Sequence, residues 1–318
     1  MKRINNIYQL ISAPGNLALA DKKARKNKLK QPGVIAFDKD SEANLTALQT
    51  MLQTKTYKTS PYTTFTIFEP KERLIYRLPY FPDRLAHHAA MNVLEKVFVS
   101  TFTADTYSCI KGRGIHAALR NLQSALQNKK ATAYCLKMDI RKFYPTVDHA
   151  ILKNLLRKKF KDQDLLSFLD EIIDSAPGLP IGNYLSQYLA NFYLTYFDHW
   201  LKEQKGVKYY YRYADDIVIL SDNKPQLHQW LSDIRNYLQV ELKLEIKHNY
   251  QVFPVAKRGI DFVGYVVYPS HTRLRKSIKQ SYARMMIRNR NKQSQASYQG
   301  WSQHANCRNL NKKLNGIV

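Results

Sequence analysis

Two adjacent carboxylates, Asp215 and Asp216, lie in the segment YYYRYADDIVIL (209–220), whose flanks are apolar and aromatic as in a β-hairpin. Like charges placed side by side are costly unless a cation offsets them. A third carboxylate, Asp139, ends the apolar run AYCLKMDI (133–140). Aspartates at a strand end and on a nearby hairpin suit hard divalent cations. The alternative is a plain hairpin turn, because aspartate is common in turns.

This pattern predicts a metal site that comprises Asp139, Ile140, Asp215 and Asp216 and binds two Mg²⁺ ions, with Mn²⁺ as the alternative ion. Two such ions can activate a 3′-hydroxyl and stabilise a leaving pyrophosphate. We expect Asp139 and Asp215 to bind both ions. We expect Asp216 to support the site, because adjacent residues of a strand point to opposite faces of a sheet.

Cationic and aromatic residues supply further parts of such a reaction. Lys71 and Arg73, in EPKERLIYRLPY, lie at a turn between two expected strands and suit a triphosphate. Tyr144, five residues after Asp139, could lie against a nucleotide sugar and exclude a 2′-hydroxyl. The alternatives are an exposed hairpin turn for the two cations and ordinary core packing for the tyrosine.

A glycine-containing loop, KGRGIHAAL (111–119), precedes an expected helix. Gly112 and Gly114 would let this loop approach a template phosphate at the helix N-terminus. Two glycines are a weak indication by themselves.

The elements that position these residues are expected to include both helices and strands. Helices are expected at 41–53, 83–98, 114–128, 148–160, 163–174 and 225–240, with a long helix in GLPIGNYLSQYLANFYLTYFDHWL (178–201) and a basic helical tail from about 277. Strands are expected at 63–70, 74–80, 133–140 and 261–268, besides the hairpin. Because strands and helices do not alternate regularly, we predict an α+β fold.

The composition indicates an anionic partner. The 318 residues include 50 Lys or Arg and 25 Asp or Glu, a formal net charge of +25. No Asp or Glu follows Asp261, whereas residues 271–318 contain 11 Lys or Arg. Nucleic acid is the usual partner of such a chain, and a membrane surface is the alternative. No 18-residue apolar run supports a membrane span, so we expect no membrane partner.

The three cysteines are scattered, which argues against a disulfide framework and favours a reducing cytoplasm. Polar residues interrupt the first 20 residues, so we expect no secretory signal. His304 and Cys307 are spaced for metal binding, but no second ligand pair accompanies them and no zinc site is expected.

Several motifs together resemble the reverse transcriptases. RYADDIVIL resembles the YxDD motif of that family, CLKMDIRKFYP its first catalytic-aspartate motif, and DFVGYVVYP its primer-grip strand. EPKERLIYRLP resembles the fingers motif that binds triphosphate, and KLEIKHNY resembles the motif whose lysine, here Lys247, lies near the nucleotide. The motifs run in the family's order over about residues 65–270.

The resemblance implies a right-hand polymerase fold. Residues 1–134 would form the fingers, with a basic N-terminal extension and part of the palm support; 135–269 would form the palm and 270–318 a basic, short helical thumb. The implied nucleotide-binding positions are Lys71, Arg73, Tyr144, Ile181, Gly182, Gln187 and Lys247. The implied template and primer positions are Gly112, Arg113, Gly114, Val263, Gly264, Tyr265, Arg273, Arg275 and Lys276.

One segment distinguishes groups within the family. Most members have Gln-Gly followed by Ser-Pro before YxDD, whereas here Ile181 replaces the glutamine and Gln187 the proline, with Gly182 and Ser186 retained. This pattern resembles the reverse transcriptases of diversity-generating retroelements. It implies error-prone cDNA synthesis opposite adenines of a template-repeat RNA, and transfer of that cDNA into a variable gene region. It also implies a small, basic, helical and oligomeric accessory protein.

Ile181 cannot make the hydrogen bond that glutamine makes near the nucleotide, so we expect weaker checking of the new base pair. The alternatives are a retron-like or group II intron-like enzyme, or a non-catalytic RNA-binding relic. An intron enzyme is expected to continue into a maturase region beyond the segment that follows the palm here. A relic is expected to lack a catalytic carboxylate, and all three are present.

Overall fold

The computed structural model describes residues 3–68, 72–288 and 291–314. The predicted triphosphate residue Lys71 lies outside the described residues. In the described part of the chain, no helix is both long enough and apolar enough to cross a membrane.

The chain packs as two compact units. The first unit comprises residues 1–103, 141–198 and 239–244, and the second unit comprises 104–140, 199–238 and 245–318. Each unit is therefore built from segments that are far apart in the sequence. The division into three consecutive parts, 1–134, 135–269 and 270–318, stays a prediction.

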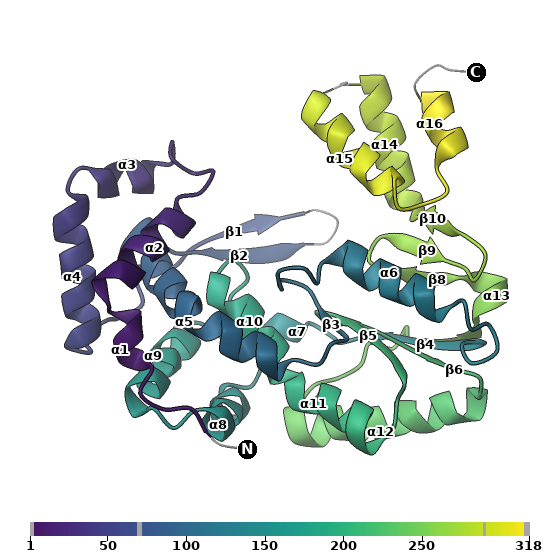
Figure 1. Cartoon of the computed structure of the whole chain (residues 1–318), viewed down its shortest axis with the longest axis horizontal. Helices are drawn as coiled ribbons and strands as arrows, with labels where there is room; N and C mark the ends of the chain where they lie inside the picture. Colours follow the sequence, from purple (N-terminus) through teal and green to yellow (C-terminus); the bar gives the residue numbers. More distant parts are fainter. Residues whose placement is uncertain (1–2, 69–71, 289–290, 315–318) are drawn as a thin grey trace. The chain divides into compact units, whose positions relative to one another are not determined.

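The first unit is mainly helical around the buried helix α5 (Leu85–Thr101), on which α2 (Pro14–Ala24) and α10 (Tyr184–Tyr193) pack (Figure 1). α5 can be buried because its small and apolar residues occupy most of its surface. The other helices of this unit are α1 (Tyr8–Ile11), α3 (Pro32–Asp38), α4 (Ser41–Gln53), the π-helical turn Tyr80–Arg84, α7 (Phe143–Thr146), α8 (His149–Lys159), α9 (Gln163–Asp174) and most of α11 (Thr195–His199).

A two-stranded hairpin extends from the first unit. Strands β1 (Thr63–Ile67) and β2 (Arg73–Arg77) pair antiparallel, as the sequence predicts. Of the predicted turn EPKER (69–73), residues 69–71 lie outside the described part.

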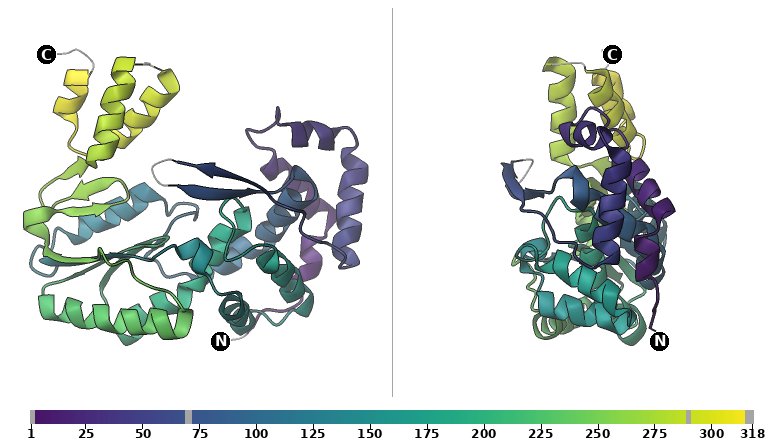
Figure 2. Two further views of the ribbon diagram at one scale, coloured as in Figure 1. Left: turned by 180° about the vertical axis from the view of Figure 1, so that it is seen from behind. Right: turned by 90° about the vertical axis from the view of Figure 1, so that its left-hand side faces the viewer.

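The second unit contains a five-stranded sheet in the order β3-β5-β6-β4-β7. Only β3 and β5 pair in parallel; the other neighbours are antiparallel. Two helices, α6 (Ile115–Ala125) and α12 (Lys224–Leu242), cover opposite faces of this sheet (Figures 1 and 2). The strands are β3 (Thr106–Tyr107), β4 (Tyr134–Asp139), β5 (Tyr209–Tyr213), β6 (Asp216–Ser221) and β7 (Gln251–Pro254).

The side chains of β6 alternate between the two faces of the five-stranded sheet, and both faces are buried. Val218 and Leu220 pack in one buried cluster with Leu119 and Leu122 of α6. Ile217 and Ile219 are buried on the opposite face, which α12 covers. The near-continuous apolar run IVIL thus reflects a strand that is buried on both faces.

A three-stranded sheet, in the order β10-β9-β8, packs on the α6 side of the second unit. The strands are β8 (Ile260–Phe262), β9 (Tyr265–Val267) and β10 (Thr272–Leu274). The single strand predicted at 261–268 is therefore wrong: it is a hairpin whose turn is Val263–Gly264. Both turn residues have positive φ, 43° and 89°, and glycine adopts this conformation at little cost.

The remaining helices of the second unit are the π-helical turn Trp200–Gln204, α13 (Val255–Arg258), α14 (Lys276–Arg288), α15 (Lys292–Ser302) and α16 (Arg308–Leu314). Among them, α14 to α16 form the predicted basic helical tail, whereas α13 was not predicted. The long helix predicted through residue 201 is interrupted at one residue: α10 ends at Tyr193, and α11 begins at Thr195.

Candidate active site

The paired carboxylates lie at the β5–β6 hairpin, where Ala214 and Asp215 form the turn and Asp216 begins β6. Ala214 has φ of +53°, a conformation that costs a residue with a side chain roughly 1–2 kcal/mol. Beneath the turn, the fully buried Arg212 donates from Nη1 to the Ala214 main-chain oxygen at 3.0 Å. The main-chain nitrogen of Arg212 donates to the oxygen of Asp105 at 3.0 Å. The buried guanidinium thus fixes the strained turn to the core.

The sheet register brings the third carboxylate to this turn. Asp139, the last residue of β4, pairs directly with Asp216. Directly opposed residues share one face of a sheet, with Cβ atoms about 5 Å apart. The main-chain nitrogen of Ile140 donates to the oxygen of Asp215 at 3.2 Å, which joins the end of β4 to the turn. The metal ligand that Ile140 could offer is its carbonyl oxygen.

The expected division of roles between Asp215 and Asp216 rested on strand alternation, which does not apply here. Asp215 lies in the turn, where the pleat of a strand does not fix its direction. Asp216, the expected supporting residue, is the one directly opposite Asp139. Which of the two binds both ions stays a prediction.

Two lysines lie beside two of these three carboxylates. The ammonium of Lys247 contacts Oδ1 of Asp139, and its main-chain nitrogen donates to the Asp139 oxygen at 2.8 Å. Lys137 Nζ lies 3.8 Å from Oδ2 of Asp216. The resemblance places Lys247 near the nucleotide; the structure places it directly beside Asp139.

Asp216 is electrostatically strained. Its pKa is raised to about 7, mainly by burial and further by the negative charges of Asp139 and Asp215, while Lys137 and Arg275 oppose the increase. Its Oδ1 is buried and has no hydrogen-bond partner among the described residues. A buried carboxylate with an unused oxygen is suited to accept a cation.

The residues fit a hard divalent cation by their donor chemistry. Carboxylate oxygens are the ligands that Mg²⁺ prefers, and one of them has no protein partner. Within the described ranges, no three His, Cys, Asp or Glu side chains are already grouped as a metal centre. A cation bound there would offset the repulsion among the three aspartates.

The predicted primer residues form the β8–β9 turn beside this sheet. A Cβ on Gly264 would lie 2.4 Å from the Trp301 ring, so the turn packs tightly against α15. The Tyr265 ring is buried, and its hydroxyl donates to the Trp301 oxygen at 3.1 Å. The guanidinium of Arg275 pairs with the Asp261 carboxylate at 2.6 Å.

The other predicted nucleic-acid residues of the second unit lie in a loop and on the strand and helix that follow this hairpin. Gly112 and Arg113 are in the loop before α6, and Gly114 is the N-cap residue of that helix. Arg273 and Lys276, at β10 and the start of α14, are exposed. His304 stacks on His116, with ring centroids 3.8 Å apart, and Cys307 is buried.

Three of the predicted nucleotide-binding residues of the first unit lie beside the β1–β2 hairpin: Ile181, Gly182 and Gln187. The main-chain oxygen of Ile181 accepts a bond of 2.8 Å from Tyr76 N of β2, and Gly182 packs under the Tyr76 oxygen. Gly182 and Gln187 line a hollow of about 480 Å³ with Arg77 of the same hairpin.

Tyr144 is half-buried in α7 and accepts a main-chain bond from Leu179 N at 2.8 Å. Arg73, at the start of β2, is exposed. These residues belong to the first unit, whereas the carboxylates and Lys247 belong to the second.

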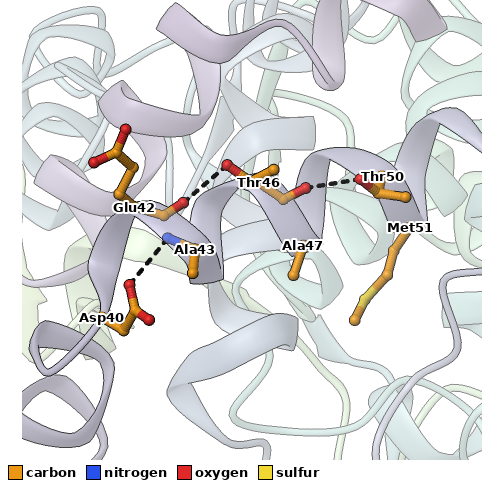
Figure 3. A pocket seen from close by; sticks show the side chains of 7 residues that line it. All are labelled: Asp40, Glu42, Ala43, Thr46, Ala47, Thr50 and Met51. Carbon is orange, nitrogen blue, oxygen red and sulfur yellow. Dashed lines mark hydrogen bonds between the residues drawn. The ribbon is translucent and has the colours of Figure 1, made fainter.

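A larger hollow, of about 740 Å³, lies along α4, but the side chains that line it do not indicate a catalytic site (Figure 3). The hydroxyls of Thr46 and Thr50 donate to main-chain oxygens one turn earlier, and Asp40 caps the helix by accepting from Ala43 N. The two threonine hydroxyls and one Asp40 oxygen are thus used within the helix.

Sequence reasoning missed two charged residues of the site, Lys137 and Arg212. Each lies inside an apolar strand, in CLKMD and YYYRY. A charged residue in a strand that is buried on both faces is itself a signal, because such a charge requires a specific partner.

Comparison with known proteins places this geometry in a family. A family model described as reverse transcriptase (RNA-dependent DNA polymerase) matches residues 69–267, more than half of the chain. The chain is 24% identical over 233 residues to Protein YkfC of Escherichia coli (strain K12), which covers 59% of this chain and 61% of that protein. It is 21% identical over 261 residues to the Group II intron-encoded protein LtrA of Lactococcus lactis subsp. cremoris, covering 59% of this chain and 43% of that protein.

The chain thus spans less than two thirds of the length of these relatives. Among solved structures, apo telomerase from Candida tropicalis has a TM-score of 0.51 at 12% identity, covering 70% of this chain and 49% of that one. This likeness concerns the fold alone, and with the mixed sheet and helices it confirms the predicted right-hand polymerase class. With the family match over residues 69–267, it follows that the chain belongs to the reverse transcriptase family.

Proposed function

We propose that the chain is an RNA-directed DNA polymerase that extends a DNA primer on an RNA template. The observation that carries this proposal is the placement of Asp139 directly opposite Asp216, with Asp215 in the adjoining turn. Three carboxylates in one small region are costly, and metal-dependent nucleotidyl transfer gives a reason for that cost.

Asp139, Asp215 and Asp216 would hold two Mg²⁺ ions, with the carbonyl oxygen of Ile140 as a further ligand. When bound, the ions supply Lewis-acid activation of the primer 3′-hydroxyl and stabilise the leaving pyrophosphate. The protein's own part is to hold the carboxylates: Arg212 fixes the turn, and Lys247 orients Asp139.

Primer extension tests this proposal. Wild-type protein should extend a DNA primer on a defined RNA template with Mg²⁺ and dNTPs, and Asp215→Ala should abolish extension. Asp222→Ala is the matched control, because Asp222 is an exposed carboxylate at the far end of β6. No extension by wild type, even with cognate RNA and accessory protein, would favour the non-catalytic relic.

We further propose that the enzyme makes adenine-mutagenic cDNA from a template-repeat RNA for transfer into a variable gene region. The support is Ile181, which stands where most reverse transcriptases have glutamine. Its main chain is bound to β2, so the side chain of this position is presented from a fixed backbone. An apolar side chain there withholds the polar contact that would check the new base pair.

The fidelity proposal is tested by sequencing products of Ile181→Gln. We expect fewer errors at template adenines than for wild type, because the polar contact is restored. Ile35→Gln, at an exposed position of α3, is the matched control and should leave the error spectrum unchanged. An unchanged adenine error rate in Ile181→Gln would reject this role.

A second candidate is a group II intron-like enzyme, which is favoured by the similarity to LtrA. It differs in one observable: extension should be faithful at template adenines. The same sequencing experiment therefore separates the two candidates.

We also propose a small, basic, helical, oligomeric accessory protein as a partner. Two basic proteins do not attract one another directly, so docking would use apolar contacts or a bridging RNA. Binding that survives nuclease treatment and high salt would exclude the RNA bridge.

A further inference from the structure

Lys137 occupies an unusual position for a lysine, in the middle of β4. It shares a face of the sheet with Asp139, two residues further along, and with Asp216, which pairs with Asp139. Its ammonium lies 3.8 Å from Oδ2 of Asp216, and its side chain is 21% exposed. A lysine this covered must have partners for its ammonium protons.

The second partner belongs to another sheet. The ammonium of Lys137 donates a hydrogen bond to the main-chain oxygen of Asp261 in β8. Lys137, Asp139 and Asp261 also line one hollow of about 430 Å³, so the lysine side chain extends from the carboxylate strand toward the β8–β9 hairpin. One ammonium therefore contacts both the carboxylate site and the hairpin.

The hairpin is fixed on its other side as well. Arg275 binds the Asp261 carboxylate from Nε at 2.7 Å, and its main-chain nitrogen donates to the Gly264 oxygen at 3.0 Å. Trp301 and Ile278 pack against Gly264. The β8–β9 turn is thus attached at one end to the C-terminal helices and at the other, through Lys137, to the carboxylates.

We propose that Lys137 is a positioning residue that fixes the β8–β9 hairpin relative to the catalytic carboxylates. This role rests on the proposed polymerase function, in which the hairpin contacts the primer. Lys137 then sets the distance between the primer 3′-hydroxyl and Asp139 and Asp216. Its importance follows from the sensitivity of transfer reactions to geometry, because a displacement of 1 Å can cost about 10²-fold in rate.

A simpler role for Lys137 is that of a counter-charge to Asp216 alone. The two roles differ in what happens to the hairpin. A counter-charge affects catalysis without changing the hairpin's stability, whereas a positioning residue affects both. The hydrogen-bond acceptor is the main chain of Asp261, so the interaction is best removed at Lys137.

The experiment compares wild type with Lys137→Met, Lys137→Arg and the control Lys224→Met, an exposed lysine at the start of α12. Hydrogen exchange of residues 260–267 is measured without nucleic acid or metal, and thermal unfolding checks that each variant folds. Single-nucleotide extension gives kcat and the KM for the incoming nucleotide. Met retains most of the side-chain volume, and Arg retains a charged donor.

Lys137→Met should exchange faster in residues 260–267 and lose about 10- to 100-fold in kcat, with the nucleotide KM changed by less than about threefold. Lys137→Arg should recover part of the slow exchange and part of the kcat, and Lys224→Met should match wild type in both measurements. Unchanged exchange in Lys137→Met overturns the proposal, whatever the activity. Faster exchange with unchanged kcat overturns it too. A wild type that extends no primer would instead overturn the proposed function, while hydrogen exchange would still decide whether Lys137 fixes the hairpin.

Discussion

Gly182 allows the loop before α10 to approach strand β2 more closely than any side chain permits. A Cβ at this position would lie 2.3 Å from the main-chain oxygen of Tyr76, and φ is +124°. The neighbouring Ile181 oxygen accepts a bond from the nitrogen of the same Tyr76. The loop that carries Ile181 is therefore attached to β2 by a backbone hydrogen bond and by close backbone contact.

We expect Gly182→Ala to lower the free energy of unfolding by about 2–4 kcal/mol, because the new methyl group overlaps backbone and the conformation is strained. Urea denaturation measures the change. Gly15→Ala is the matched control: nothing lies within 4 Å of that position in α2, and alanine favours helix, so stability should be equal or higher. Equal stability of Gly182→Ala and wild type would contradict the close approach.

The residues of the site differ in how far the sequence could reveal them. Asp139, Asp215 and Asp216 were predictable as a group, because adjacent like charges in an apolar hairpin require an offsetting cation and a third carboxylate ends another apolar run. The partners of Lys137 and Arg212 were not predictable, because both are main-chain oxygens: that of Asp261 is brought close by tertiary packing, and that of Ala214 lies in the adjoining turn. Backbone acceptors leave no mark in the sequence.

At the level of elements, Asp162 joins the N-terminal segment to helix α9. Its Oδ2 accepts from Ile7 N at 2.7 Å and Tyr8 N at 2.9 Å, and its Oδ1 caps α9 by accepting from Leu165 N at 3.1 Å. Burial by itself raises the pKa of this carboxyl, but the main-chain donors of Tyr8, Leu165 and Ile7 outweigh it, so the net pKa is lowered.

We expect Asp162→Ala to lower the free energy of unfolding by about 2–4 kcal/mol at pH 7, because a helix cap and two further donors lose their acceptor. Because the pKa of Asp162 is lower in the folded state, its contribution to stability is complete above the pKa of the unfolded state, about 3.9. The contribution is lost as the pH falls through the pKa of the folded state. Urea denaturation at pH 7 and in acid should therefore show the difference from wild type narrowing in acid.

Asp164→Ala is the control for this prediction. Asp164 is in the same helix, is 44% exposed and pairs with Lys55 at 2.6 Å. Its loss should cost less than about 1 kcal/mol, because an exposed ion pair contributes little. A difference between Asp162→Ala and wild type that does not depend on pH would refute the role of the charge.

Elements were predictable where one periodicity ran between clear boundary residues. α9 (Gln163–Asp174) has the predicted bounds because Asp162 caps it and its apolar residues follow a helical period. The segment 261–268 reads as one apolar run, and only the left-handed conformation of Val263 and Gly264 divides it into β8 and β9. A single interior glycine does not reveal whether it marks a turn or a bulge.

For the whole molecule, the net charge of +25 indicates nucleic acid but not the surface that binds it. The structure narrows the choice for the C-terminal helices. Lys276 and Lys279 are exposed in the first turn of α14, next to the β8–β9–β10 sheet. Lys129 and Lys130 are equally exposed in the loop between α6 and β4. Composition by itself does not separate these two pairs, because it carries no information about the surface on which a charge lies.

If α14 contacts the backbone of a primer–template duplex, each of its lysines that binds a phosphate releases counterions when the complex forms. The double variant Lys276→Gln/Lys279→Gln should then reduce the slope of log K against log salt by roughly 2, about one for each phosphate contact, as measured by fluorescence anisotropy with an RNA–DNA hybrid. Lys129→Gln/Lys130→Gln removes the same charge and should leave that slope unchanged. Equal reductions in the two variants would mean that the chain binds through its overall charge, without a defined path along α14. A reduction confined to Lys276 and Lys279 would place the duplex on the same side of the second unit as the hairpin that Lys137 and Arg275 hold.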